Sequence, residues 1–192
     1  MSTWDQNDTA QPRHCRTCGT VVERRVPDGD NRLRDVCPVC GAIHYDNPLN
    51  VVGTLPWRRN GQGEVEVLLC LRNIEPQLGF WTLPAGFMEN EESVAEGALR
   101  ETQEEAGADI VLGELLLLCT VRRANQVHFF YTAELQSDRF DPGEETQAVG
   151  LYTRESLPWG RIAFASVKLA LEVFFSQIND GGFHLHCADI PS

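Results

Sequence analysis

Residues 86–108, GFMENEESVAEGALRETQEEAGA, place Arg100 beside three acidic residues, Glu101, Glu104 and Glu105. In a helix, residues three and four apart lie on one side, so the three carboxylates share a face with roughly 6 Å between Cβ atoms. Like charges at that spacing destabilise a bare helix. A hard cation such as Mg²⁺ or Mn²⁺, which prefers oxygen ligands, would offset the repulsion. The segment therefore predicts a metal-binding helix.

The sequence also marks the ends of this helix. Ser93 and Glu96 form an S-x-x-E capping box, and Gly107 is placed to terminate the helix. We expect a modest buried stripe, with the glutamates on another face. Its members are Val94, Ala98, Leu99, Thr102 and Ala106. The alternative is a solvated acidic helix without a metal.

The same segment resembles the signature of the Nudix hydrolases, G-x5-E-x7-R-E-U-x-E-E-x-G-U, in which U is aliphatic. All seven fixed positions match: Gly86, Glu92, Arg100, Glu101, Glu104, Glu105 and Gly107. The two aliphatic positions hold Thr102 and Ala108. Glu91 stands where many members have a turn glycine, and we expect Asn90, which tolerates positive φ, to make that turn. The resemblance implies the Nudix fold, an α/β/α sandwich with a mixed sheet, within the mixed α and β classes.

The resemblance also implies a metal site and a reaction. Glu101, Glu104 and Glu105 would coordinate Mg²⁺ or Mn²⁺ together with the carbonyl of Gly86. The metal would polarise phosphoryl oxygens and activate water, which attacks one phosphorus of a nucleoside diphosphate linked to another group.

Further residues would support this chemistry. By the same resemblance, Arg100 would orient Glu101, and Glu92 would support the network. The general base would be Glu101 or a glutamate from a later loop. In the segment PGEET, Glu145 is the preferred candidate and Glu144 the alternative, although both could equally be solvated loop charges.

A second pattern lies near the N-terminus. Four cysteines, Cys15, Cys18, Cys37 and Cys40, have the spacing C-x2-C-x18-C-x2-C, which is typical of a zinc ribbon. Four thiolates close a tetrahedral site, so the zinc would be structural. The competing interpretation is two disulfides, which the lack of a secretion signal disfavours. With four cysteines present, we expect the flanking His14 and His44 to be bystanders.

The remaining histidines and cysteines receive structural interpretations. Cys70, Cys119 and Cys187 lie in apolar, strand-like surroundings and are expected to be small buried hydrophobes. His184 and His186 are expected at the surface, and His128 is expected to pack on its strand. None of these six residues is predicted to bind metal.

Hydrophobic patterns divide the chain into parts. We predict a flexible N-terminus over residues 1–12, a zinc ribbon over 13–47, a catalytic domain over 48–180 and a tail over 181–192. Within the domain, runs 50–57 and 64–72 predict a hairpin about Asn60-Gly61. Apolar strand-like runs follow the acidic helix, and 163–178 predicts a second helix with Phe164, Val167, Leu171 and Phe174 on one face. Alternation in 183–187 predicts an edge strand.

The net charge and the lack of evident targeting signals restrict the expected partners and location of the protein. The net charge is −12, and residues 49–192 hold ten basic and twenty-one acidic side chains. Such a surface repels nucleic acid and free pyrophosphate alike, so we expect no nucleic-acid partner, and we expect bound cations and a few placed arginines to meet the substrate. No signal peptide or apolar membrane span is evident, which predicts a cytoplasmic protein. We expect a homodimer because dimers are common among relatives that cleave dinucleotides.

Two further stretches indicate a substrate class through their resemblance to a Nudix subgroup. The ribbon, YDNPLNVVG and LPWGRIAFASVKLAL are similar to a zinc-ribbon Nudix subgroup that cleaves ADP-ribose and FAD. NADH pyrophosphatases also have four zinc-binding cysteines, but their S-Q-P-W-P-F-P-x-S array is missing here. Trp81, Phe129 and Tyr131 could stack on a base, or belong to the core. A non-catalytic ligand sensor and a zinc-ribbon adaptor for nucleic acid or protein stay open as alternatives.

Overall fold

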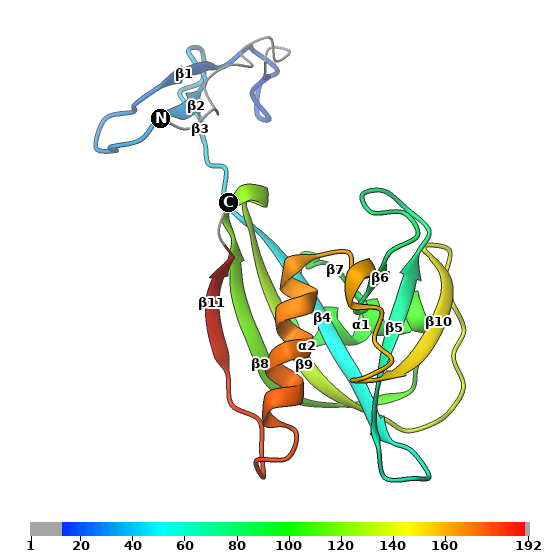
Figure 1. Cartoon of the computed structure of the whole chain (residues 1–192). Helices are drawn as coiled ribbons and strands as arrows, with labels where there is room; N and C mark the ends of the chain where they lie inside the picture. The colour runs from blue at the N-terminus through cyan, green and yellow to red at the C-terminus, as the bar shows by residue number, and fades with distance from the viewer. Residues whose placement is uncertain (1–12, 191–192) are drawn as a thin grey trace. The chain divides into compact units, whose positions relative to one another are not determined.

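The structure, a computed structural model, describes residues 13–190, and the chain divides into two compact units, Met1–Asn47 and Pro48–Ser192 (Figure 1). The flexible segment predicted for residues 1–12 lies outside the described residues. Within the described part, no helix is long and apolar enough to cross a membrane.

The first unit is a small antiparallel sheet with two cysteine-bearing turns. Its strands are β1 (Glu23–Arg25), β2 (Arg34–Val36) and β3 (Ile43–His44), in the order β1-β2-β3. Gly19 and Gly41 adopt φ of 75° and 74°, which lets each C-x2-C turn close. Apart from cysteines, the apolar side chains that this unit buries within its described residues are Val36 and Pro27. So small an interior cannot hold the unit folded without a further constraint.

The second unit is built on an eight-stranded mixed sheet. Its strands are β4 (Leu49–Arg59), β5 (Val65–Arg72), β6 (Trp81–Thr82), β7 (Ala85–Phe87), β8 (Ile110–Val121), β9 (Gln126–Leu135), β10 (Thr146–Thr153) and β11 (His186–Ile190). The order is β10-β5-β4-β9-β8-β11, with β6 on β5 and β7 on β4. The β4–β9 and β8–β11 pairs are parallel, and the other pairs are antiparallel.

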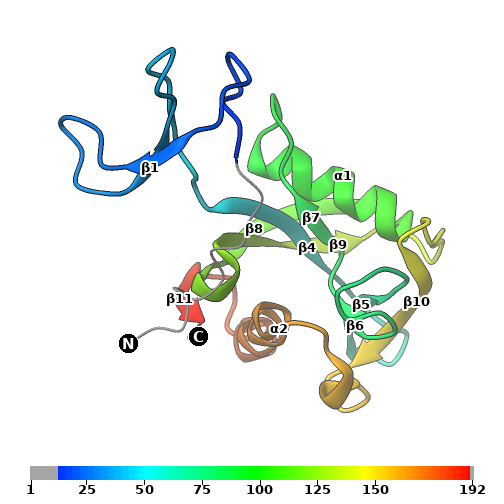
Figure 2. The same ribbon diagram turned by 90° about the horizontal axis from the view of Figure 1, so that it is seen from above.

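Two helices cover the opposite faces of this sheet. They are α1 (Val94–Ala106) and α2 (Ala165–Gln177), and Figure 2 shows the sheet running between them. Two short 3-10 turns, Arg122–Ala124 and Trp159–Arg161, complete the elements. The predicted α/β/α sandwich with a mixed sheet is therefore confirmed.

The larger part of the core lies under α2. Val167, Leu171 and Phe174 are buried there, as the helical spacing predicts, and Phe174 packs on Trp57 with ring centroids 5.8 Å apart. Phe164 precedes the helix as its N-cap residue rather than lying within it. Burial of this apolar stripe anchors α2, since each large side chain contributes about 1.5–3 kcal/mol.

The face under α1 differs from the prediction. Leu99, expected in the buried stripe, is 38% exposed, whereas Glu101 and Glu105 are 9% and 7% exposed. The smaller apolar cluster on this side includes Ala106 but also strand residues such as Leu68. The expectation that the glutamates project from a separate face was therefore wrong for Glu101 and Glu105, because the sheet lies against the side of the helix that carries them, whereas Glu104 is exposed.

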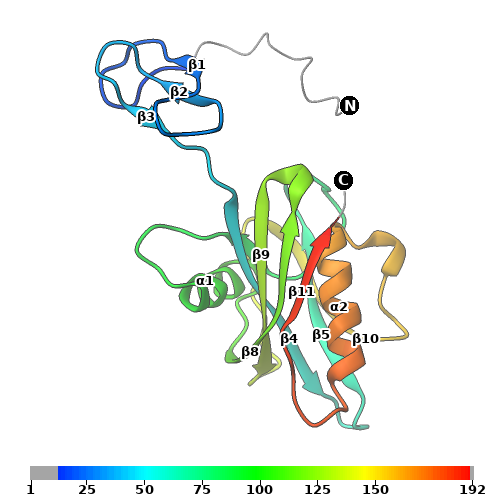
Figure 3. The ribbon, with the colours of Figure 1, turned by 90° about the vertical axis from the view of Figure 1, so that its left-hand side faces the viewer.

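The C-terminal strand also departs from the expectation. An edge strand exists, but β11 begins at His186, so the predicted range 183–187 was too early (Figure 3). Along β11, Ala188 and Ile190 pack against the core, and the alternate residue Cys187 is exposed. The prediction that Cys187 is buried was thus wrong, whereas Cys70 and Cys119 are buried as expected.

The three histidines of the second unit behave as expected. His184 and His186 are exposed, and His128 is buried on β9. Burial lowers the pKa of His128 to about 4, so this imidazole is neutral at physiological pH.

Candidate functional site

The ends of α1 are fixed as the sequence predicts. Ser93 Oγ accepts a hydrogen bond from the Glu96 backbone N–H at 3.2 Å, and the Ser93 N–H donates to Glu96 Oε2 at 2.8 Å. At the other end, Gly107 adopts φ of 55° and its N–H donates to the Gln103 carbonyl. The capping box and the glycine cap therefore set which turn of the helix presents each glutamate.

Arg100 is the centre of the carboxylate network on α1. Its Nε and Nη2 donate to the two oxygens of Glu92 at 3.0 and 2.8 Å. Its Nη1 donates to Glu101 Oε1 at 2.7 Å and to Glu104 Oε2 at 3.0 Å. The hydrogen bonds from Arg100 hold the pKa of Glu92 at about 2, so Glu92 stays ionised. One guanidinium thus orients three carboxylates, which agrees with the supporting roles expected for Arg100 and Glu92.

Two of the three expected metal ligands are buried carboxylates. Burial raises the pKa of Glu101, and it raises the pKa of Glu105 to about 8 although the Ala85 N–H donates to Glu105 Oε2 at 3.0 Å. The Glu104 side chain is 59% exposed. Buried carboxylates that face each other are stabilised in their ionised form by a nearby cation. The chemistry of this donor set, all oxygen and acidic, fits Mg²⁺ or Mn²⁺.

Gly86 lies where β7 passes closest to this network. A Cβ built on Gly86 would overlap the carboxylate of Glu101, so a larger residue cannot be placed there without displacing that side chain. Gly97 is similar, because its Cβ would lie 2.6 Å from Glu92 Oε1. The two glycines let β7 and α1 approach the carboxylates closely, which is the arrangement that a backbone ligand at Gly86 requires.

The turn before the helix differs from the prediction. Glu91 itself adopts a positive φ of 69°, so the expectation that Asn90 makes the turn was wrong. Glu92 Oε1 accepts the Glu89 N–H at 2.7 Å across this turn. The hydrogen bonds of Glu92 to Arg100 and to the turn fix the backbone here, and Glu91 accommodates the left-handed conformation that they impose.

The loop that carries Glu144 and Glu145 packs on the end of α1. The Asp141 N–H donates to the Ala106 carbonyl at 2.9 Å, and the Asn73 N–H donates to the Glu145 carbonyl at 2.8 Å. Burial is the largest cause that raises the pKa of Glu101 and Glu105, and the negative charge of Glu145 is a smaller cause in the same direction. Glu145, distant from the signature in sequence, therefore lies within electrostatic reach of the buried glutamates.

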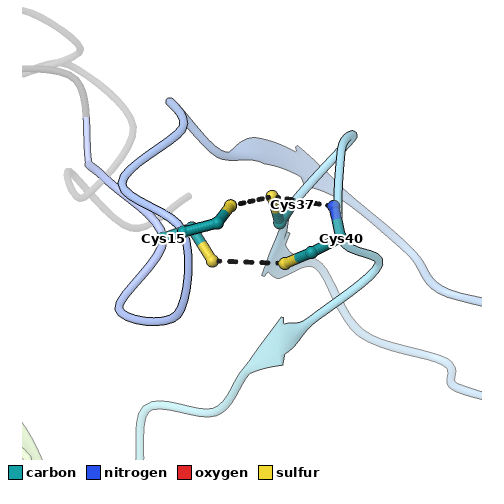
Figure 4. Close-up of side chains that lie close together, drawn as sticks. Cys15, Cys37 and Cys40 are labelled. Carbon is teal, nitrogen blue, oxygen red and sulfur yellow. Dashed lines mark hydrogen bonds between the residues drawn. The ribbon is translucent and has the colours of Figure 1, made fainter.

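The four cysteines of the first unit converge on one point (Figure 4). Their Sγ atoms all lie within 4.8 Å of one another, with 3.6 Å between Cys15 and Cys40 and 3.4 Å between Cys18 and Cys37. These distances exceed the about 2.05 Å of a disulfide and approach the roughly 3.8 Å between thiolates on a tetrahedral zinc. The geometry therefore excludes the disulfide interpretation and fits a four-thiolate metal site.

The surroundings of Cys15 favour its thiolate form. Burial raises the pKa of Cys15, but hydrogen bonds from the backbone N–H groups of Cys18 and Thr17 and from His44 outweigh it, and the pKa is about 5. His44 Nε2 lies 3.3 Å from Cys15 Sγ, so this histidine, expected to be a bystander, contacts a cluster thiol. Hydrogen bonds to sulfur of this kind support a metal-bound thiolate.

The two candidate metal sites differ in how close together their candidate ligand atoms lie. Among residues 13–190, the cysteines are the one group of three or more Cys, His, Asp or Glu residues whose ligand atoms all lie within 4.8 Å of one another. The α1 carboxylates are instead distributed about Arg100.

The reasoning from sequence missed one charged residue near the carboxylates. Arg72, the last residue of β5, is 8% exposed and its charge opposes the rise in the pKa of Glu105 that burial causes. Its position at the end of the apolar run EVEVLLCLR was the available signal. Of the aromatic residues considered for base stacking, Trp81 packs edge-on against Tyr152 with 5.1 Å between ring centroids, as part of the core.

Comparison with known proteins identifies the family. A family model described as NUDIX domain matches residues 49–169, and one described as Nudix N-terminal matches residues 13–46. The chain belongs to the Nudix hydrolase family. It carries the zinc ribbon of this family at its N-terminus, as the cysteine spacing predicts.

Three Nudix relatives illustrate the range of similarity. A crystal structure of a NUDIX hydrolase from Nitrosomonas europaea is 39% identical with a TM-score of 0.87, covering 94% of this chain and 99% of that one. The NAD-capped RNA hydrolase NudC of Stutzerimonas stutzeri is 31% identical over 57% of this chain and 35% of its own length. Nudix hydrolase 21, chloroplastic, of Arabidopsis thaliana is 46% identical over 34% of this chain and 33% of its own length. This chain thus spans about a third of the length of the curated relatives it matches.

Proposed function

We propose that this protein hydrolyses the pyrophosphate bond of a nucleoside diphosphate linked to another moiety, with ADP-ribose and FAD as the first candidates. The observation that carries the proposal is the network in which Arg100 orients Glu92, Glu101 and Glu104 beside the buried Glu105. Buried acidic ligands held by an arginine are the arrangement that metal-assisted phosphoryl chemistry requires. The resemblance of the ribbon and flanking segments to the ADP-ribose and FAD subgroup supports the choice of substrate.

Each residue would have a separate task in the reaction. Bound Mg²⁺ or Mn²⁺ would neutralise charge on the phosphoryl oxygens and lower the pKa of the attacking water. Glu101, Glu104 and Glu105 would hold the metal with the Gly86 carbonyl, and Arg100 would keep Glu101 in the required orientation. Glu145 would accept the proton of the water. Positioning and charge neutralisation would supply most of the rate enhancement.

The proposal is tested by a substrate screen. Purified full-length protein is incubated with ADP-ribose, FAD, NADH, NAD⁺, diadenosine polyphosphates and nucleoside triphosphates, each with Mg²⁺ and with Mn²⁺. We expect metal-dependent release of AMP from ADP-ribose or FAD with the highest kcat/KM. Products formed in ¹⁸O-labelled water identify the phosphorus that is attacked. Lack of turnover on every diphosphate, with the metal sites loaded, would reject the proposal and favour a ligand sensor.

A second candidate is a substrate that contains NAD. The relative named NAD-capped RNA hydrolase is 31% identical over 110 residues, which supports adding an NAD-capped RNA oligomer to the NADH already in the screen. The protein has a net charge of −12, and this acidic character disfavours binding of the RNA chain of a capped RNA. Preference for the capped RNA over free NADH, with a steep loss of affinity as salt rises, would favour this candidate and overturn the predicted absence of a nucleic-acid partner.

Glu145 offers a direct test of the proposed base. We expect Glu145→Gln to lower kcat by about 10²-fold or more with little change in KM, because a general base contributes to the transition state rather than to ground-state binding. Glu144→Gln is the matched control, since it removes the neighbouring carboxylate from the same exposed loop. Equal and small effects of the two substitutions on kcat would leave both residues as solvated loop charges.

A further inference from the structure

Arg72 is a buried cation without a carboxylate partner. It is 8% exposed, and among residues 13–190 no Asp or Glu oxygen lies within ion-pair distance of its guanidinium. Its Nε donates to the Pro76 carbonyl at 2.8 Å, and its Nη2 donates to the Ile74 carbonyl at 3.5 Å. Its guanidinium also lies over the Phe164 ring, 5.1 Å from the centroid. A charge removed from water in this way is costly unless an anion reaches it.

One nitrogen of Arg72 remains free for such an anion. Nη1 donates no hydrogen bond to any residue in the described part of the chain, in contrast to Nε and Nη2. Among the described residues, His128 Nδ1 is the sole fully buried side-chain nitrogen or oxygen without a partner, so Arg72 Nη1 is not fully buried. The carbonyls and the aromatic ring therefore hold the guanidinium fixed, and one edge of its planar fork stays open.

The position of Arg72 on the sheet places its guanidinium near the candidate active site. Arg72 and Cys70 are alternate residues on β5 and so point to the same face, and Cys70 Sγ contacts the Glu105 carbonyl at 3.9 Å. Arg72 also pairs with Thr146, next to Glu145, in the β5–β10 register. Burial raises the pKa of Glu105, and the charge of Arg72 opposes that rise. The guanidinium thus lies near the buried end of the carboxylate network.

We propose that Arg72 binds the diphosphate of the substrate, donating from Nη1 to a non-bridging phosphate oxygen. The inference rests on the proposed function. Arg100 donates hydrogen bonds to three glutamates and to the Phe87 carbonyl, so each nitrogen of its guanidinium already has a partner. Arg72 is instead held in place by carbonyls and has one nitrogen without a partner. In a strongly acidic protein, a diphosphate needs such a cation beside the metal. The carbonyl contacts of Arg72 pre-organise it for this task.

The competing role is purely structural. Arg72 could serve only to close the loop 73–79 through its hydrogen bonds to the carbonyls of Ile74 and Pro76. Such a role would affect the stability of the fold, whereas the proposed role affects the affinity for phosphate groups. Arg72→Gln removes the charge, and Arg72→Lys keeps the charge but loses the planar fork and the stacking on Phe164. These two variants separate the roles.

The experiment measures binding of α,β-methylene-ADP, a non-hydrolysable diphosphate, to the full chain by calorimetry with Mg²⁺ present. We expect Arg72→Gln to weaken binding about tenfold to hundredfold, as loss of a charge-assisted hydrogen bond implies, and Arg72→Lys to weaken it less. For whichever diphosphate the native protein cleaves, KM should rise in the same order, while the Mn²⁺ concentration for half-activation stays within about twofold. Thermal unfolding verifies that each variant is folded.

Arg58→Gln is the matched control, because Arg58 is an arginine of β4 paired with Glu66, at the end of the strand away from β7, and it should leave binding unchanged. Binding within about twofold of the native protein in both folded Arg72 variants overturns the proposal, as does a change confined to the Mn²⁺ requirement. Lack of turnover by the native protein on every diphosphate instead rejects the proposed function, and the inference fails with it.

Discussion

Glu105→Gln is expected to lower kcat by a factor on the order of 10² to 10⁴ while the protein stays folded. The substitution preserves the shape of the side chain and leaves an oxygen to accept the Ala85 N–H, which donates to Glu105 Oε2 at 3.0 Å. It removes the negative charge that would hold the metal, so charge on the phosphoryl oxygens would be less well neutralised. Glu101→Gln should act similarly, because Glu101 is also buried and is oriented by Arg100.

This prediction is checked by steady-state kinetics over a range of Mg²⁺ and Mn²⁺ concentrations, alongside thermal unfolding. Glu155→Gln is a suitable control, since Glu155 is an exposed glutamate of the turn after β10 and should retain native turnover. A partial recovery of kcat at high Mn²⁺ would further indicate weakened metal binding rather than loss of the base. Near-normal turnover of folded Glu105→Gln and Glu101→Gln proteins at ordinary metal concentrations would remove both residues from the mechanism.

Removal of zinc should unfold the first unit. We propose one structural Zn²⁺ on the four cysteines, and its binding free energy, about 10–16 kcal/mol in small zinc domains, would replace the missing hydrophobic core. Val36 and Pro27 are nearly the whole apolar interior apart from the cysteines within the described part of this unit. Cys37→Ser, or strong chelation, should therefore abolish zinc binding and expose the ribbon to proteolysis. The exposed pair Arg24 and Arg25 on β1 provides trypsin sites for detecting this.

Zinc content by mass spectrometry and limited trypsin digestion measure the outcome. The second unit has its own buried core on both faces of the sheet, so residues 48–190 should stay resistant when the ribbon is cut. Cys187→Ser is the matched control because Cys187 is exposed on β11, outside the cluster. Native zinc content and native resistance in the Cys37→Ser protein would contradict a structural four-cysteine site.

Several features of the fold were predictable because their causes are local. The capping box of Ser93 and Glu96 and the glycine cap at Gly107 gave both ends of α1, since hydrogen bonds between neighbours in sequence decide where a helix begins and ends. The cysteine spacing likewise gave the ribbon, because two C-x2-C turns can present four thiols to one ion. Alternation near the C-terminus gave an edge strand, although its start at His186 depends on pairing with β8.

Other features were not predictable from local patterns. Leu99 lies on the exposed side of α1, and Glu91 rather than Asn90 takes the positive φ, because the packing of α1 on the sheet and the hydrogen bonds of Glu92 override local preference. Helical periodicity states which residues share a face, but it does not state which face meets the sheet. That choice buries Glu101 and Glu105 and so raises their pKa.

The sequence by itself determined the family signature, the acidic and sulfur residues of the two candidate metal sites and the division after residue 47, because these follow from residue type and short spacing. Only the tertiary structure decided which carboxylates lose contact with water and which distant residues join them. Strand pairing brings the loop before β10 onto the end of α1 and sets Arg72 beside it, 33 positions before Glu105 in the chain. Burial and electrostatic coupling depend on such long-range packing, which spacing along the chain does not encode.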